Sequence, residues 1–164
     1  MMTPMPRFAR TIRFDDSDGR VFPLGAGADE WAVSGAVVFA GAAASQIAGK
    51  QKQAFANGFL SAESAGWATF VAIAEASDDD ILAVTANLAK AFISEFGAPD
   101  TQAAQSAAES EVADMLALCA DVPVNTLFAI AREFGDDGEI REAIRTVSAP
   151  GEKPHTRIWD VVAD

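Results

Sequence analysis

Residues 65–99 read AGWATFVAIAEASDDDILAVTANLAKAFISEFGAP, and this stretch decides the fold class. Its first part, residues 65–76, is apolar on both faces of an extended chain, which is typical of a central strand covered on two sides. In its second part, Ser77 can cap a helix and Asp80 can reach back as in a capping box. Gly97 is placed to end that helix. A strand followed by a helix of this kind predicts an α+β protein.

The helix after Ser77 carries mainly apolar residues at the 3.6-residue spacing of one buried face. They are Ile81, Leu82, Thr85, Leu88, Ala89, Phe92, Ile93 and Phe96. A second helix is predicted from Asp100, as its cap, to about residue 121. Cys119 lies on the apolar stripe of that helix, and buried cysteine usually acts as a small hydrophobe. We therefore expect Cys119 to be a core side chain.

Outside this stretch, alternation of apolar and polar residues predicts further strands. They cover residues 7–14, 20–24, 30–40 and 125–134, and the first three are expected to form an antiparallel meander. A helix is predicted at 48–60, with an end at Gly58 as the alternative, because glycine is unfavourable within a helix. A second is predicted at 139–147, with a hairpin strand as the alternative. The prediction is an α+β fold with an antiparallel sheet of four or five strands and three or four helices packed on it. It places one domain at 1–147 and a tail at 148–164.

The composition limits the classes of function. The 164 residues carry a net charge of −12, from 24 acidic and 12 basic residues. Nucleic-acid binding and binding to an anionic membrane surface usually need a basic surface, so we expect neither. A single cysteine and the lack of an apolar stretch after the N-terminal arginines predict a cytoplasmic protein.

The acidic residues are unevenly distributed. Residues 95–121 contain six carboxylates and no lysine or arginine. This pattern indicates either a solvated helix surface or a docking face for a basic partner. Glu111 and Asp114 are spaced to share one helix face, which we expect to be wet.

No familiar constellation of catalytic residues is present. The one histidine, His155, lies in the tail, and one cysteine with one histidine does not make a zinc site. Residues 15–19, DDSDG, lack the later glutamate of a calcium loop, so a turn is expected. Gly25 and Gly27 lack the third glycine and the helix of a dinucleotide site. We expect no catalytic residue, no metal and no cofactor.

Two features remain as candidate sites. The tail carries an aromatic anchor within a short apolar motif, comprising Ile158, Trp159, Val161 and Val162. It is either a docking arm for a partner or a segment that folds back on its own domain. Arg10 falls on the apolar face of the first predicted strand, where it either contacts an anion or extends to water.

Four motifs resemble an uncharacterised alphaproteobacterial family of small acidic proteins. The motifs occupy residues 10–15, 30–33, 53–60 and 132–135 (RTIRFD, EWAV, QAFANGFL and REFG), and the resemblance covers about residues 8–147. The family has no assigned activity, so it implies no functional residue. It does imply occurrence beside accessory genes for metalloenzyme maturation.

These observations favour a non-catalytic interaction or assembly protein, with a protein partner or a homo-oligomer as its context. The alternative is a small-molecule-binding protein, or an enzyme that uses carboxylates or a bound cofactor. That alternative requires an apolar pocket with a few polar groups, which we expect between the sheet and the helix at 81–96.

Overall fold

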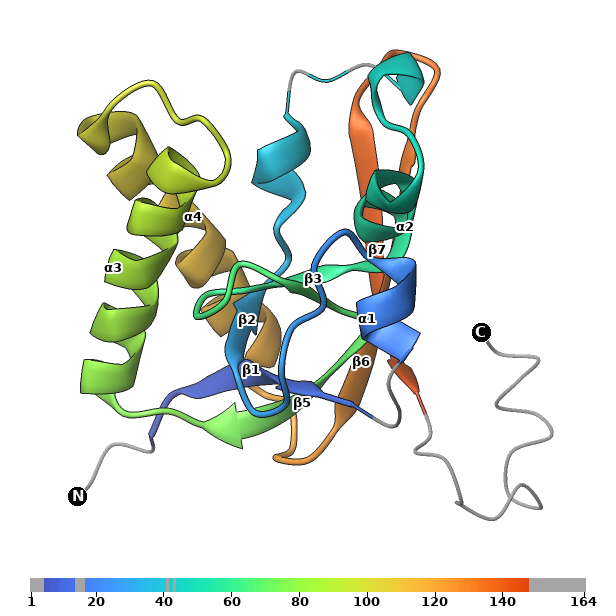
Figure 1. Ribbon diagram of the computed structural model, residues 1–164. Coiled ribbons are helices and arrows are strands. Elements are labelled where there is room, and N and C mark those ends of the chain that lie inside the picture. Colours follow the sequence, from blue (N-terminus) through green and yellow to red (C-terminus); the bar gives the residue numbers. More distant parts are fainter. Residues whose placement is uncertain (1–4, 14–16, 41, 43, 148–164) are drawn as a thin grey trace, which may run out of the picture.

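Seven strands form one antiparallel sheet in the computed structural model, which describes residues 5–13, 17–40, 42 and 44–147 (Figure 1). The sheet is a half-barrel with the strand order β4-β3-β2-β1-β5-β6-β7. The strands are β1 (Arg7–Ile12), β2 (Trp31–Val33), β3 (Phe59–Ser61), β4 (Trp67–Ala68), β5 (Phe70–Glu75), β6 (Leu127–Phe134) and β7 (Ile140–Val147). The α+β class is confirmed, with more strands than the four or five predicted.

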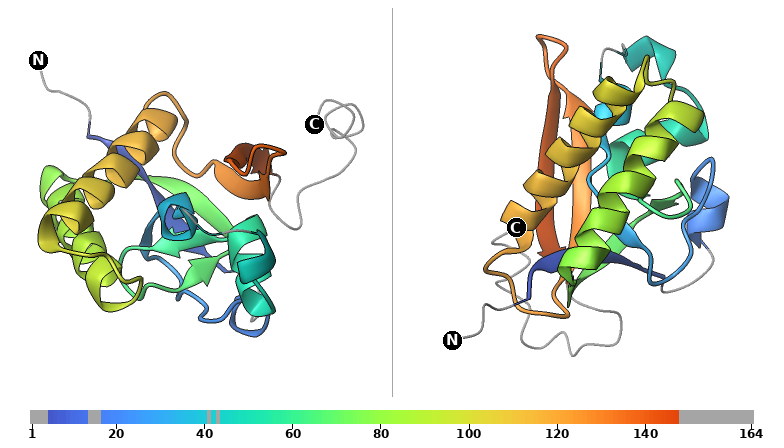
Figure 2. Two further views of the ribbon diagram at one scale, coloured as in Figure 1. Left: turned by 90° about the horizontal axis from the view of Figure 1, so that it is seen from above. Right: turned by 90° about the vertical axis from the view of Figure 1, so that its left-hand side faces the viewer.

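Four α-helices accompany the sheet within the same residues. They are α1 (Ser17–Val21), α2 (Lys50–Asn57), α3 (Asp78–Ser94) and α4 (Thr101–Cys119), and short 3-10 turns occupy Ala36–Phe39 and Ala44–Gln46. Figure 2 shows α3 and α4 side by side, and α4 also packs on β1 and β2. Within the described residues, no helix has both the length and the apolar character needed to cross a membrane.

The predicted N-terminal caps of the two long helices are confirmed, while the first helix ends at Ser94, before the predicted Gly97. The Ser77 hydroxyl accepts the amide of Asp80 at 3.0 Å, and the Asp80 carboxylate accepts the amide of Ser77 at 2.9 Å. Asp100 caps α4 by accepting the amide of Ala103. The apolar stripe of α3 is only partly right, because Leu82 is 69% exposed and Ile93 is 44% exposed.

The first strand of the chain lies in the middle of the sheet. β1 pairs with β2 on one side and with β5 on the other, so the predicted meander is wrong. Its second strand, predicted at 20–24, is replaced by α1. The cause is Asp18, which is buried and accepts the Thr69 hydroxyl at 2.6 Å, anchoring the helix to the sheet.

Three other predicted elements are shorter than expected. The strand predicted at 30–40 ends at Val33, because Gly35 has a φ of +86° and leads into a 3-10 turn. The helix predicted at 48–60 ends at Asn57, and its last residues form β3 instead. The strand predicted at 65–76 divides at Thr69 into β4 and β5.

The helix predicted at 139–147 is wrong, and the hairpin alternative is right. Ile140 and Ile144 are four residues apart, a spacing that fits one face of a strand as well as one face of a helix. Residues 135–138 form the predicted turn, in which Gly138 has a φ of +80° and donates its amide to the Gly135 carbonyl. The turn joins β6 directly to β7.

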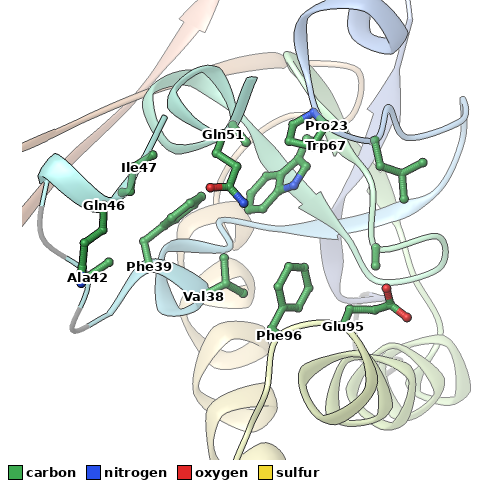
Figure 3. Close-up of a pocket in the computed structure, with 13 residues that line it drawn as sticks. Pro23, Val38, Phe39, Ala42, Gln46, Ile47, Gln51, Trp67, Glu95 and Phe96 are labelled. Atoms are coloured by element: carbon green, nitrogen blue, oxygen red, sulfur yellow. The ribbon is translucent and has the colours of Figure 1, made fainter. Parts of the chain in front are cut away.

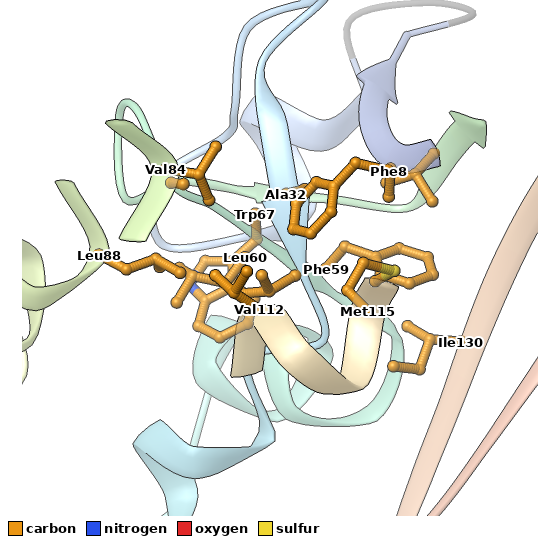
Figure 4. Close-up of a cluster of buried hydrophobic side chains, with 14 of the residues drawn as sticks. Phe8, Ala32, Phe59, Leu60, Trp67, Val84, Leu88, Val112, Met115 and Ile130 are labelled. Atoms are coloured by element: carbon orange, nitrogen blue, oxygen red, sulfur yellow. The ribbon is translucent and has the colours of Figure 1, made fainter. Parts of the chain in front are cut away.

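The core lies between the inner face of the sheet and the helices (Figure 4). Phe8, Phe59 and Leu60 are fully buried there. Cys119 is also fully buried, which confirms its predicted place in the core. Burial raises the pKa of its thiol to about 12, so the thiol stays protonated and unreactive at neutral pH.

Candidate functional site

A cavity of about 320 Å³ opens beside Trp67 (Figure 3). It lies between the end of α3, the turn at Ala36–Phe39 and the start of α2. Its walls are mainly apolar and come from Pro23, Leu24, Val38, Phe39, Ala42, Ile47, Ala54, Ala65, Trp67 and Phe96. The size falls near the lower end of ordinary small-molecule sites.

The polar groups of this cavity are few. Gln46, Gln51 and Glu95 are its polar side chains, all three exposed to solvent. The Trp67 side chain is only 4% exposed, and its indole N–H makes no hydrogen bond within the described part of the chain. Phe39 and Phe96 lie around the same indole, with ring centroids 5.5 Å and 6.5 Å from it.

A buried arginine connects the elements around the cavity. Arg132 on β6 has a fully buried side chain, and its Nε donates to Glu142 on β7 at 2.9 Å. Its two terminal nitrogens donate to four backbone carbonyls, those of Ser34, Ala54, Phe55 and Gly58. One guanidinium therefore joins β6, β7, α2 and the segment after β2. Burial lowers its pKa, and the bond with Glu142 opposes that shift.

Glu111 on α4 holds the segment that forms one cavity wall. Its carboxylate accepts the amide of Gly35 at 3.0 Å and the amide of Val37 at 3.4 Å. Val38 and Phe39, which line the cavity, come directly after these residues. The expectation of a wet face shared by Glu111 and Asp114 is therefore wrong, because Glu111 is buried while Asp114 is exposed.

Burial raises the pKa of Glu111 above its ordinary value of 4.5, although the two backbone amides lower it. The folded protein thus keeps the Glu111 proton to a higher pH than the unfolded chain does. Stability from this group falls as pH rises from the ordinary value through the raised pKa. We expect the free energy of unfolding of the wild type, minus that of Glu111→Gln, to decrease as pH rises from the ordinary pKa of 4.5 through the raised pKa.

Urea unfolding at a series of pH values measures this difference. Glu109→Gln, which removes an exposed carboxylate from the same helix, controls for the change in net charge. If this difference in the free energy of unfolding increases with pH, the pKa of Glu111 is not raised by folding.

β7 is an edge of the sheet, and within the described residues it pairs only with β6. The amide of Gly135 donates to the Glu139 carbonyl. Hydrogen-bonded and non-bonded pairs alternate from that point along an antiparallel ladder. Residues 140, 142, 144 and 146 should therefore turn their backbone groups outward, away from β6.

Residues 5–157 match DUF6505, described as a family of unknown function. The chain belongs to this family. No curated protein and no solved structure matches it. The DUF6505 match confirms the predicted membership in a family without assigned function and extends ten residues past the end of β7.

Among the predicted site residues of this DUF6505 chain, Arg10 lies within the described part and is not among the residues that line the cavity. Arg10 does fall on an apolar face of β1, where its guanidinium carbon lies 4.3 Å from the centre of the Trp31 ring. Its Nε is buried without a hydrogen-bond partner among the described residues. The tail residues Ile158, Trp159, Val161 and Val162, and His155, lie outside the described residues.

Neither Arg132 nor Glu111 was predicted from the sequence to be a buried charge. A signal for Arg132 existed, because the alternation that puts Phe128 and Ile130 on the inner face of β6 continues to position 132. Glu142 likewise lies in phase with Ile140 and Ile144. Among the described residues, no group of three or more histidine, cysteine, aspartate or glutamate residues could hold a metal ion.

Proposed function

We propose that the protein is a non-catalytic interaction protein that adds an extended segment of a partner protein to the outer edge of β7. The observation that carries the proposal is the outer edge of β7, which no other described strand covers. Eight residues of regular strand offer unpaired backbone groups on one side within the described part of the chain. Strands of this length without a covering element are ready templates for pairing with another chain.

The side chains of β7 indicate the chemistry of the partner. Arg141 and Arg145 are exposed, while Glu142 is neutralised by Arg132, so the strand is locally basic in a chain of net charge −12. Ile140 and Ile144 are only half-buried. An extended segment in which acidic residues alternate with apolar residues would complement both features. A second copy of this chain fits less well, because two copies of charge −12 repel.

The tail extends the proposed surface. It begins directly after β7, so Ile158, Trp159, Val161 and Val162 would give the same partner a second, aromatic contact. The proposal includes a cytoplasmic setting and an accessory role beside a larger enzyme. The resemblance to a family found near metalloenzyme maturation genes supports that role. The proposal includes no binding to nucleic acid or to a membrane.

A pair of variants at Thr146 tests the edge. Thr146 is exposed and its amide should point outward, so Thr146→Pro removes one docking amide without removing a bond to β6. Thr146→Val keeps the amide and is the matched control. The tagged full-length protein, both variants and residues 1–147 are used to isolate a stoichiometric partner from the native host. Binding of the purified partner is then measured by calorimetry.

We expect Thr146→Pro to weaken binding at least tenfold while Thr146→Val binds as the wild type does. In the complex, hydrogen exchange should slow at residues 140–146. Absence of a partner, equal binding by Thr146→Pro, or unprotected β7 amides would each refute the proposal. If the protein instead forms a homodimer that Thr146→Pro abolishes, the partner in the proposal would be a second copy of this chain.

A further inference from the structure

We propose that the cavity beside Trp67 is a binding site for a small organic amine, in which an apolar body lies against the aromatic walls and the ammonium group faces Glu95. This inference is independent of the β7 edge. The cavity and the edge are formed by different residues, so either can fail without the other.

The first argument is the free donor in the wall. The indole N–H of Trp67 donates to no group within the described residues. It is not among the buried unsatisfied atoms there, so it is open to solvent in a side chain that lines the cavity. In Figure 3, Trp67 lies between Gln51 on one side and Phe96 with Glu95 on the other. A ligand atom that accepts a hydrogen bond, or an ordered water beside the ligand, would satisfy this donor.

The second argument is charge. Among the described residues, Glu95 is the only ionisable side chain in the lining, and it ends α3 as its C-terminal cap. The last turn of α3 contains no basic residue to offset the negative end of the helix dipole. The carboxylate and the dipole therefore favour a cation at the same place. The net charge of −12 would raise the local concentration of cations further.

The third argument is the aromatic wall. Phe39, Trp67 and Phe96 contribute three rings to one cavity. Aromatic faces attract ammonium groups as well as apolar carbon, and recessed aromatic sites are used for such ligands. A carboxylate ligand would meet Glu95 with a like charge. The lining therefore discriminates amines from acids of the same shape.

Three probes of matched shape test the inference: 2-phenylethylamine, 2-phenylethanol and 3-phenylpropanoate. Binding is followed by the NMR signal of the Trp67 indole N–H, and Trp31→Phe and Trp159→Phe identify that signal by removing the other two. We expect the amine to shift it at the lowest concentration and the acid to shift it least. Since Glu95 is exposed, Glu95→Gln should weaken amine binding about fivefold. It should leave binding of the alcohol unchanged.

Glu109→Gln, which is exposed on α4 and outside the cavity, should bind all three probes as the wild type does. An unshifted Trp67 indole signal at millimolar amine would overturn the site. Equal binding of the three probes, or an amine affinity unaffected by Glu95→Gln, would overturn the assignment to amines.

Discussion

Replacing Arg132 with alanine is expected to destabilise the protein by about 3–5 kcal/mol, because it leaves backbone carbonyls in the interior without a donor. The substitution removes the donors to Glu142 and to four backbone carbonyls in one step. Those carbonyls belong to α2 and to the segments around β2 and β3. The Ala54 carbonyl keeps the amide of Gly58. Each of the other three is left without a donor and accounts for at least about 1 kcal/mol of that cost.

Urea unfolding followed by circular dichroism measures the loss. Arg132→Met keeps an apolar stem in the same space and lacks the donors, so it should lose nearly as much stability as Arg132→Ala. Arg145→Ala removes an exposed arginine from the same hairpin and should change stability by no more than about 0.5 kcal/mol. A loss at Arg132→Ala below about 1 kcal/mol would show that the guanidinium does not connect these elements.

Gly35→Ala is expected to cost about 2–5 kcal/mol, from two additive causes. The left-handed backbone, with a φ of +86°, costs about 1–2 kcal/mol for a residue with a side chain. The new Cβ would also lie 2.6 Å from Leu60 Cβ and 3.0 Å from Trp67 Cζ3, and overpacking of a core costs about 1–3 kcal/mol. Thermal and urea unfolding measure the total.

Gly97→Ala separates the two causes. Gly97 has a φ of +72°, and a Cβ there would meet nothing within 4 Å. It should therefore show the backbone cost alone, about 1–2 kcal/mol. Equal losses at Gly35 and Gly97 would mean that the wall beside Trp67 yields to the added methyl group.

The two long helices could be predicted from the sequence because their signals are local. Ser77 with Asp80, and Asp100 with the amide of Ala103, satisfy their bonds within one turn. The exposure of Leu82 could not be predicted, because the apolar stripe of α3 is wider than the surface available to cover it. Spacing identifies a helix and its approximate inner face, and the neighbouring elements decide which of those residues are buried.

The sheet was predicted less well because its short strands depend on distant partners. β4 has two residues and β3 three, too few for an alternating pattern to be recognised. The bonds of Arg132 to α2 span more than 70 residues, so no local motif predicts them. The cavity beside Trp67 does lie at the end of the predicted helix over 81–96, where a pocket was expected. The described residues that line the cavity come from five separate segments of the chain, and the spacing of residues along the sequence does not show that these segments meet.

The central place of β1 has a consequence for how the chain folds as it is synthesised. β1 joins the half-sheet β4-β3-β2 to the half-sheet β5-β6-β7, and its pairing with β5 links residue 7 to residue 75. One edge of β1 therefore stays open until residues 70–75 have been synthesised. Closing so long a loop slows folding. The α3–α4 and β6–β7 hairpins follow β5 in the chain, and because their contacts are local they can form quickly once they are synthesised.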